Sequence, residues 1–323
     1  MRHIPRVILG VFTILLLALT ACTSGQQGGD VTSPFIGGTN ALEMSFITGA
    51  PPAEIYDNKD SKFAISLQLR NSGEADIDTN DGYVQITGIS PNEFGLSYAD
   101  LKQNMPAIKG AKKSSNGQVT QGRLDVITFD GLSYQQNIVG NIGSSKVRAI
   151  ACYNYKTRAS ADVCVKESSV DELDRNSVCT LAGSKNFANS GGPLQIVSAT
   201  QNPVGGQKVQ MTFEIASKAG SSDLFMRKDT ECNDQTNNPD MYKVWVNVLP
   251  INNNAVSANC NQFGGGSSGY ITLYNGQPQP LICDFTIGSV TSDFVTRVNV
   301  ELEYRMMQFI EKPILIKDVT END

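Results

Sequence analysis

Apolar residues recur at every second position in several stretches of this chain, and this period constrains the fold more than any other feature. Phe63, Ile65, Leu67 and Leu69 alternate with smaller or polar residues. Successive side chains of a strand point to opposite faces, so the pattern is typical of a strand buried on one face. We therefore predict an all-β protein, a sandwich or barrel of short strands. The same alternation returns at 84–86, 124–126, 147–155, 209–215, 242–248 and 298–304.

A comparison of the chain with itself indicates a duplication. A shift of 151 positions (304 minus 153) superposes 146–167 on 297–318 without a gap, with Tyr153 on Tyr304. We interpret each segment as two strands and their connection, so the first would be a hairpin centred on Arg158. The apolar residues of the second connection would fill the core or form an exposed contact patch. These residues are Met306, Met307, Phe309 and Ile310.

Polar stretches divide the chain into two domains of ordinary size. Residues 182–193 are polar and rich in Gly, Ser and Asn, so we expect a linker there between sandwich domains at 41–181 and 194–319. The first domain carries a long insertion at 91–121. Short helical turns are expected at 97–102 and at 169–174, where Ser169 and Glu172 have the spacing of a capping box.

Six cysteines follow Cys22, and an even count in an exported chain predicts disulfides. None of them has the C-x-x-C spacing of a zinc or redox site. The preferred pairing is Cys152 with Cys164, Cys179 with Cys232, and Cys260 with Cys283; a rival set joins Cys164 to Cys179. Complete pairing needs at least one bridge between the halves or their linker.

The first residues have the pattern of a secretory signal. Arg2, His3 and Arg6 precede an apolar run at 7–19 that is shorter than the roughly 20 residues a membrane-spanning helix needs. The sequence Leu-Thr-Ala-Cys at 19–22 resembles the lipobox of prokaryotic lipoproteins. That resemblance implies a signal peptide at 1–21 and a lipid on Cys22, with an extracytoplasmic chain anchored to the cell membrane. Residues 22–40, polar and rich in glycine, would form a flexible tether.

The strand at 65–70, followed by Asn71-Ser72-Gly73, resembles the immunoglobulin-like domains of archaeal and bacterial surface proteins, the CARDB type among them. The opening of the second half, from Gln201 to Ile215, is similar. The resemblance implies two tandem immunoglobulin-like β-sandwiches acting as spacers or binding modules, and it transfers no catalytic residue. The chain departs from antibody domains because it has no Cys-Trp-Cys pattern, Trp245 being its only tryptophan.

Charge and histidine content exclude several classes of function. A net charge of −6 argues against a nucleic-acid partner, and the compact basic group at Lys109, Lys112 and Lys113 is expected in a solvated loop. The only histidine, His3, lies in the expected signal peptide. The mature chain would therefore lack the histidine that a Ser-His-Asp or Cys-His catalytic system and many zinc sites require. Enzymes built on paired carboxylates stay open.

One acidic stretch suits a calcium loop. Asp76, Asp78 and Asn80 place oxygen-bearing side chains at alternate positions before Gly82. An EF-hand would have glycine where Asp81 stands and glutamate where Thr87 stands, so this is at best a partial loop completed by other segments such as 57–60. The alternative is an acidic turn between strands.

The sequence thus predicts a non-catalytic, lipid-anchored interaction or structural module of the cell surface. Its partners would be membrane lipid through Cys22 and other envelope or surface proteins or glycans. It would need no cofactor, calcium apart. Two alternatives are a carboxylate-based hydrolase of envelope glycan and a solute-binding lipoprotein of a transporter; the latter class is usually α/β, with strand-helix units that this sequence lacks.

Overall fold

We describe the protein from a computed structural model. All described strands belong to one compact unit, Pro34–Asp323. The expected signal peptide, Cys22 and the short helix at 169–174 lie outside the described residues. The structure describes residues 33–138, 142–167, 178–205, 208–220, 223–235, 237–251, 256–288 and 290–319; the side chain of Ile142 is not described.

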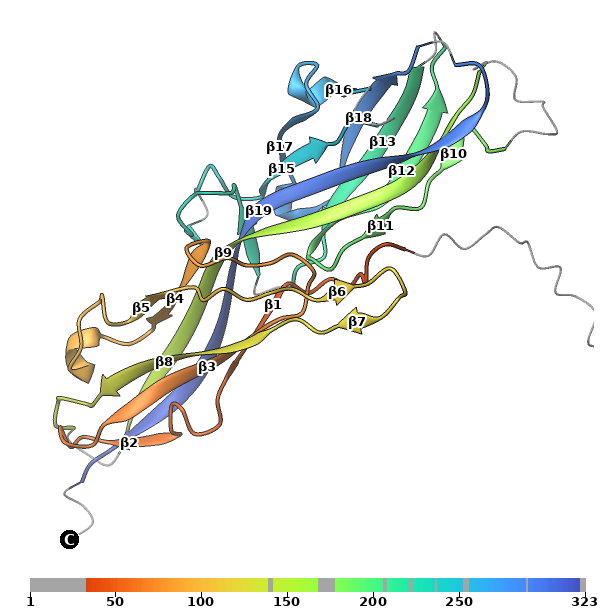
Figure 1. Ribbon diagram of the computed structural model, residues 1–323. Coiled ribbons are helices and arrows are strands. Elements are labelled where there is room, and N and C mark those ends of the chain that lie inside the picture. Colours follow the sequence, from red (N-terminus) through yellow and green to blue (C-terminus); the bar gives the residue numbers. More distant parts are fainter. Residues whose placement is uncertain are drawn as a thin grey trace, which may run out of the picture. The chain divides into compact units, whose positions relative to one another are not determined.

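The fold is an all-β sandwich, as the alternation predicts. Two antiparallel sheets lie against a larger third one (Figure 1). The first has the order β1-β3-β8, with β1 at Leu42–Phe46, β3 at Phe63–Asn71 and β8 at Leu124–Leu132. The second has the order β10-β12-β13-β18-β16, with β10 at Gly183–Ser184, β12 at Leu194–Pro203, β13 at Lys208–Ser217, β18 at Gln279–Thr286 and β16 at Ala258–Cys260.

The third sheet has nine strands and serves both sandwiches. Its main path is β17-β15-β19-β9-β4-β5, with β17 at Ser268–Thr272, β15 at Lys243–Val248, β19 at Phe294–Lys317, β9 at Ile142–Val165, β4 at Gly82–Thr87 and β5 at Lys102–Asn104. Three short strands pair off this path: β11 (Ala188–Asn189) with β9, and β14 (Leu224–Met226) and β2 (Glu54–Tyr56) with β19.

Two strands of 24 residues hold the sheet together. β9 and β19 pair antiparallel along their whole length, from Phe294 opposite Val165 to Lys317 opposite Ile142, and they run side by side in Figure 1. Asn154 lies opposite Arg305. These two residues are 151 positions apart, so each faces its own equivalent in the other repeat. The duplication therefore appears in the structure as an approximate two-fold axis between Asn154 and Arg305.

Hydrogen bonds beside this axis follow the same symmetry. The Tyr153 hydroxyl donates to Gln308 Oε1 at 2.6 Å and accepts from the Leu42 amide at 3.3 Å. Its equivalent, Tyr304, bonds Thr157 Oγ1 at 2.8 Å and the backbone of Leu194. Thr157 and Gln308 are 151 positions apart, and Leu42 and Leu194 each begin the strand that covers the tyrosine. The buried apolar residues of both sandwiches accordingly form one continuous cluster.

The predicted hairpin at Arg158 is wrong, because no turn interrupts β9. The alternation of buried residues continues from Val147 to Val165 without Gly or Pro, and the polar Thr157 and Ser160 are buried members of the strand. The four apolar residues at 306–310 likewise belong to β19, where Met306 and Met307 are buried. The second half of each long strand extends into the sandwich of the other repeat. There β9 pairs with β11, and β19 pairs with β2.

Two of the three preferred disulfide pairs are also wrong. The structure joins Cys152 to Cys232, Cys164 to Cys179 and Cys260 to Cys283. Cys260–Cys283 is the one pair of the preferred set that is confirmed. Cys164–Cys179 is the pair of the rival set. Cys152 and Cys164 lie on one continuous strand, about 40 Å apart at about 3.3 Å per residue. A disulfide joins Cα atoms roughly 6 Å apart, so this pair cannot form.

Segments expected to be loose are built into the fold. Residues 182–193, expected as a linker, form β10 and β11, which pair with β12 and β9. The insertion at 91–121 buries Phe94, Leu101, Met105 and Ile108. It also carries β5, the hairpin of β6 (Lys112–Lys113) with β7 (Val119–Thr120), and a 3₁₀ turn at Pro91–Phe94. The helix expected at 97–102 is a single turn that leads into β5.

The end of the expected tether is bound to the sandwiches. The amides of Ile36 and Gly37 each donate to the Glu74 carboxylate at 3.0 Å, and the Gly191 amide donates to it at 2.7 Å. The Gly38 carbonyl accepts from the amide of Gly192 at 3.2 Å. Glycine suits these positions because Gly37 and Gly38 both have positive φ, and because a Cβ at Gly191 would lie only 3.0 Å from the Gly37 carbonyl oxygen.

Candidate functional site

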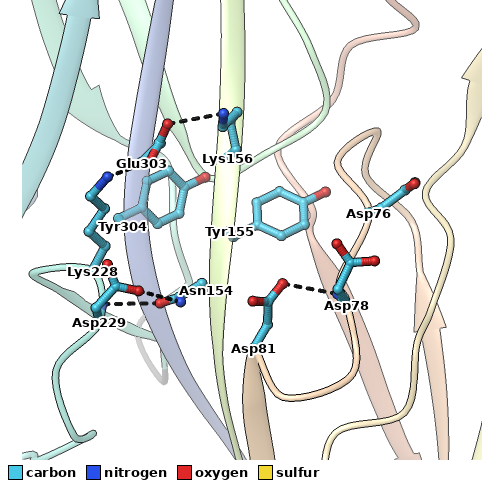
Figure 2. Close-up of a pocket in the computed structure, with 10 residues that line it drawn as sticks. All are labelled: Asp76, Asp78, Asp81, Asn154, Tyr155, Lys156, Lys228, Asp229, Glu303 and Tyr304. Atoms are coloured by element: carbon cyan, nitrogen blue, oxygen red, sulfur yellow. Dashed lines mark hydrogen bonds and ion pairs between the residues drawn. The ribbon is translucent and has the colours of Figure 1, made fainter.

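A polar hollow of about 280 Å³ opens beside the two-fold axis, on the edge of β9. One wall is the loop between β3 and β4, and the other is the segment that follows β14, as Figure 2 shows. Side chains of β9 and β19 lie between the walls. The lining residues are Asp76, Asp78, Asp81, Asn154, Tyr155, Lys156, Lys228, Asp229, Glu303 and Tyr304.

The acidic wall begins with a carboxylate that two lysines neutralise. Asp76 pairs with Lys112 at 2.9 Å and with Lys109 at 3.0 Å, and it accepts from the Gly110 amide at 3.0 Å. Burial opposes ionisation, but the bonds from Lys112, Gly110 and Lys109 lower the pKa of Asp76 from 3.8 to about 2. Asp76 thus fastens the chain at 109–112 to the loop of the hollow.

The other two carboxylates of this wall, those of Asp78 and Asp81, have fewer charged partners. Asp78 is 69 % exposed and makes one long ion pair, 3.7 Å, with Lys109. The Asp81 carboxylate accepts from the Asp78 amide at 3.0 Å. Asn80, between them, has a positive φ and is exposed, so it lies outside the lining.

The opposite wall is a chain of ion pairs across the sheet. Glu303 accepts from Lys228 at 2.7 Å and from Lys156 at 3.0 Å, and Lys156 also pairs with Glu301. Burial would raise the pKa of Glu303, but the bonds from the two lysines lower it. Burial would lower the pKa of Lys228, but Glu303 raises it. Both ends of this pair therefore stay charged near neutral pH.

Below the lysines, Asp229 is tied to the centre of β9. The Asn154 amide group donates to Asp229 Oδ1 at 2.9 Å, and the Asp229 backbone amide donates back to Asn154 Oδ1 at 3.3 Å. The Cys152–Cys232 disulfide fixes the same segment three residues further on. Because Cys152 is on β9 of the first repeat, this bridge holds a loop of the second repeat against it.

The structure places the predicted site residues as follows. Asp76 and Asp78 lie together in the hollow, whereas Asn80 does not. Asp57, considered as a further calcium ligand, accepts instead from the backbone amides of Ile138 and Val319. The six cysteines are all in disulfides.

In the structure, Asp76 of the acidic stretch forms ion pairs with Lys109 and Lys112. These lysines occupy the carboxylate that a calcium ion would need. Among the described residues, no group of three or more His, Cys, Asp or Glu side chains is arranged to hold a metal ion. Within the same ranges, no helix is long and apolar enough to cross a membrane.

The other half of the hollow cannot be recognised from any local sequence pattern. Asn154, Lys156, Glu303, Lys228 and Asp229 form no local motif, because they come from three separate segments. One signal was available: the 151-residue repeat makes β9 and β19 equivalent strands. Read as continuous strands rather than hairpins, they become candidates to pair with each other.

No protein-family model matches this chain, and no match was found among curated proteins.

Proposed function

We propose that this protein is a lipid-anchored, non-catalytic interaction or structural module on the extracytoplasmic face of the cell membrane. Its two sandwiches would be of the immunoglobulin-like type, and its partners other envelope or surface proteins or glycans. The observation that carries the proposal is the set of three disulfides. Disulfides of this kind persist in oxidising compartments outside the cytosol.

The way the repeats are joined supports a mechanical or binding role. Two long strands, a disulfide between repeats and the Glu74 carboxylate fasten both sandwiches and residues 36–38 into one unit. A module so fastened presents its loops in a constant arrangement, which suits recognition because binding then costs little ordering entropy.

The chemistry of the hollow gives less support to a carboxylate-based hydrolase. Such an enzyme needs one carboxyl group that keeps its proton near neutral pH. The lysines instead lower the pKa of Asp76 and Glu303, the two lining carboxyls with resolved shifts. A pair held in the ionised state serves charge complementarity rather than proton donation.

The anchor is tested in intact cells of the host fed a palmitate analogue. The native protein should incorporate the label and stay with the membrane, whereas Cys22→Ser should lose both. Thr23→Ser is the matched control, because it changes the neighbouring residue and keeps the thiol. Unchanged membrane retention of Cys22→Ser would contradict the anchor.

A further inference from the structure

The edge of β9 is open inside the hollow. The Asn154 amide donates to the Asp81 carbonyl at 3.0 Å, and the Arg158 amide donates to Ser190 Oγ at 2.9 Å. Alternate residues of a strand point their N–H and C=O groups to the same side. Those of Lys156 therefore point to this side too, and among the described residues no group bonds them there. One residue of the strand edge, Lys156, is left unpaired between the start of β4 at Gly82 and the end of β11 at Asn189.

Three carboxylates beside this opening, those of Asp78, Asp81 and Asp229, lack the short ion pairs that Asp76 and Glu303 make within the described chain. Two lysines neutralise Asp76, and two more neutralise Glu303. By contrast, Asp78 has only its 3.7 Å contact with Lys109, and the Asp81 and Asp229 carboxylates are bonded to uncharged groups within the described chain. An incoming cation would thus meet three carboxylates beside a free backbone donor and acceptor.

We propose that the hollow binds an extended peptide segment that carries lysine or arginine. Its backbone would pair with Lys156 on the open edge, and its cationic side chain would lie among Asp78, Asp81 and Asp229. Strand addition of this kind takes affinity from main-chain hydrogen bonds and specificity from alternate side chains. The proposal names the partner class of the proposed interaction module and rests on that function, but not on the lipid at Cys22.

An anionic ligand fits the site less well. Lys156 and Lys228 are both held by Glu303, so an anion would have to displace a bonded carboxylate. The charge and the open edge together therefore favour a cationic peptide.

Calorimetry on the purified full chain with its disulfides intact tests the charge. The probe is a blocked peptide in which valine and lysine alternate, with a glutamate-for-lysine analogue as its counterpart. Asp78→Asn combined with Asp81→Asn should weaken binding of the lysine peptide roughly tenfold at low salt, which corresponds to about 1.4 kcal/mol of binding free energy. Asp60→Asn combined with Asp130→Asn is the matched control, since both residues are exposed and lie elsewhere, and it should leave binding unchanged.

Two further measurements test the backbone contact without altering the protein. N-methylation of the peptide's central amides should abolish binding, because it removes the donors that strand pairing needs. Hydrogen exchange of the Lys156 amide should be fast in the free protein and slow in the complex.

Three outcomes would overturn the proposal: equal binding of the glutamate analogue, equal binding of the N-methylated peptide, or unchanged exchange at Lys156. Binding of an uncharged oligosaccharide in place of the peptide would also contradict it. Because the purified chain needs no anchor for these measurements, failure of the peptide site and failure of the Cys22 anchor are distinguishable.

Discussion

At the scale of single residues, lysine and arginine side chains keep carboxylates ionised across the outer surface of the shared sheet. Lys156 and Lys228 hold Glu303, and Arg148 with Lys146 holds Glu311. These contacts lower the pKa of Glu303 and of Glu311. The same chemistry at Asp76 joins the loop of the hollow to the insertion, so this residue links local charge to stability.

Asp76 makes the stability of the protein depend on acid pH. The pKa of Asp76 is about 2 in the folded chain, against 3.8 for an unperturbed aspartate. A depressed folded pKa adds stability above pH 3.8 that is lost as the pH falls from about 4 to 2. Because Lys109 and Lys112 are more than half exposed, solvent screening limits this contribution to about 1 kcal/mol.

Asp76→Asn should therefore lower the free energy of unfolding by about 1 kcal/mol at pH 7, and the difference from the native chain should vanish near pH 2. Urea unfolding at several pH values measures it. Asp60→Asn, at an exposed residue elsewhere, is the control and should leave the free energy of unfolding at pH 7 unchanged within about 0.5 kcal/mol. A constant difference across the whole range would show that the ion pairs are not its cause.

At the scale of elements, the sequence predicts strands well and their extent poorly. The alternation at 63–69 lies within β3, that at 209–215 lies within β13, and that at 242–248 overlaps β15. The length of β9 could not be read locally, because a strand of 24 residues is stable only with a partner along its whole length. That partner, β19, lies more than 120 residues away in the chain.

The tyrosines beside the two-fold axis test the seam between β9 and β19. Tyr153→Phe removes the hydroxyl that bonds both the Gln308 oxygen and the Leu42 amide. It should therefore lower the free energy of unfolding by about 1 to 2 kcal/mol. Tyr304→Phe, the equivalent change, should cost a similar amount. Thermal or urea unfolding measures both.

Tyr98→Phe is the matched control, because Tyr98 is 76 % exposed and its hydroxyl has no partner in the described chain. It should change stability by less than about 0.5 kcal/mol. If Tyr153→Phe cost no more than this control, the hydrogen bonds across the seam would contribute nothing.

At the scale of the whole molecule, the two repeats are interlocked rather than placed one after the other. Their cores are continuous, and β9 and β19 each serve both sandwiches. The repeat and the parity of the cysteines already predicted two related halves with at least one bridge between the halves or their linker. The hollow could not be predicted, because its charges come from loops and strands that only the interlocking brings together.

Disulfide mapping tests both the interlocking and the proposed compartment. The protein should be isolated from its host with free thiols blocked at lysis, then digested and analysed by mass spectrometry without reduction. The expected pairs are Cys152–Cys232, Cys164–Cys179 and Cys260–Cys283, with no blocked thiol at these positions. Recovery of Cys152–Cys164 would contradict a continuous β9, and six blocked thiols would contradict an extracytoplasmic location.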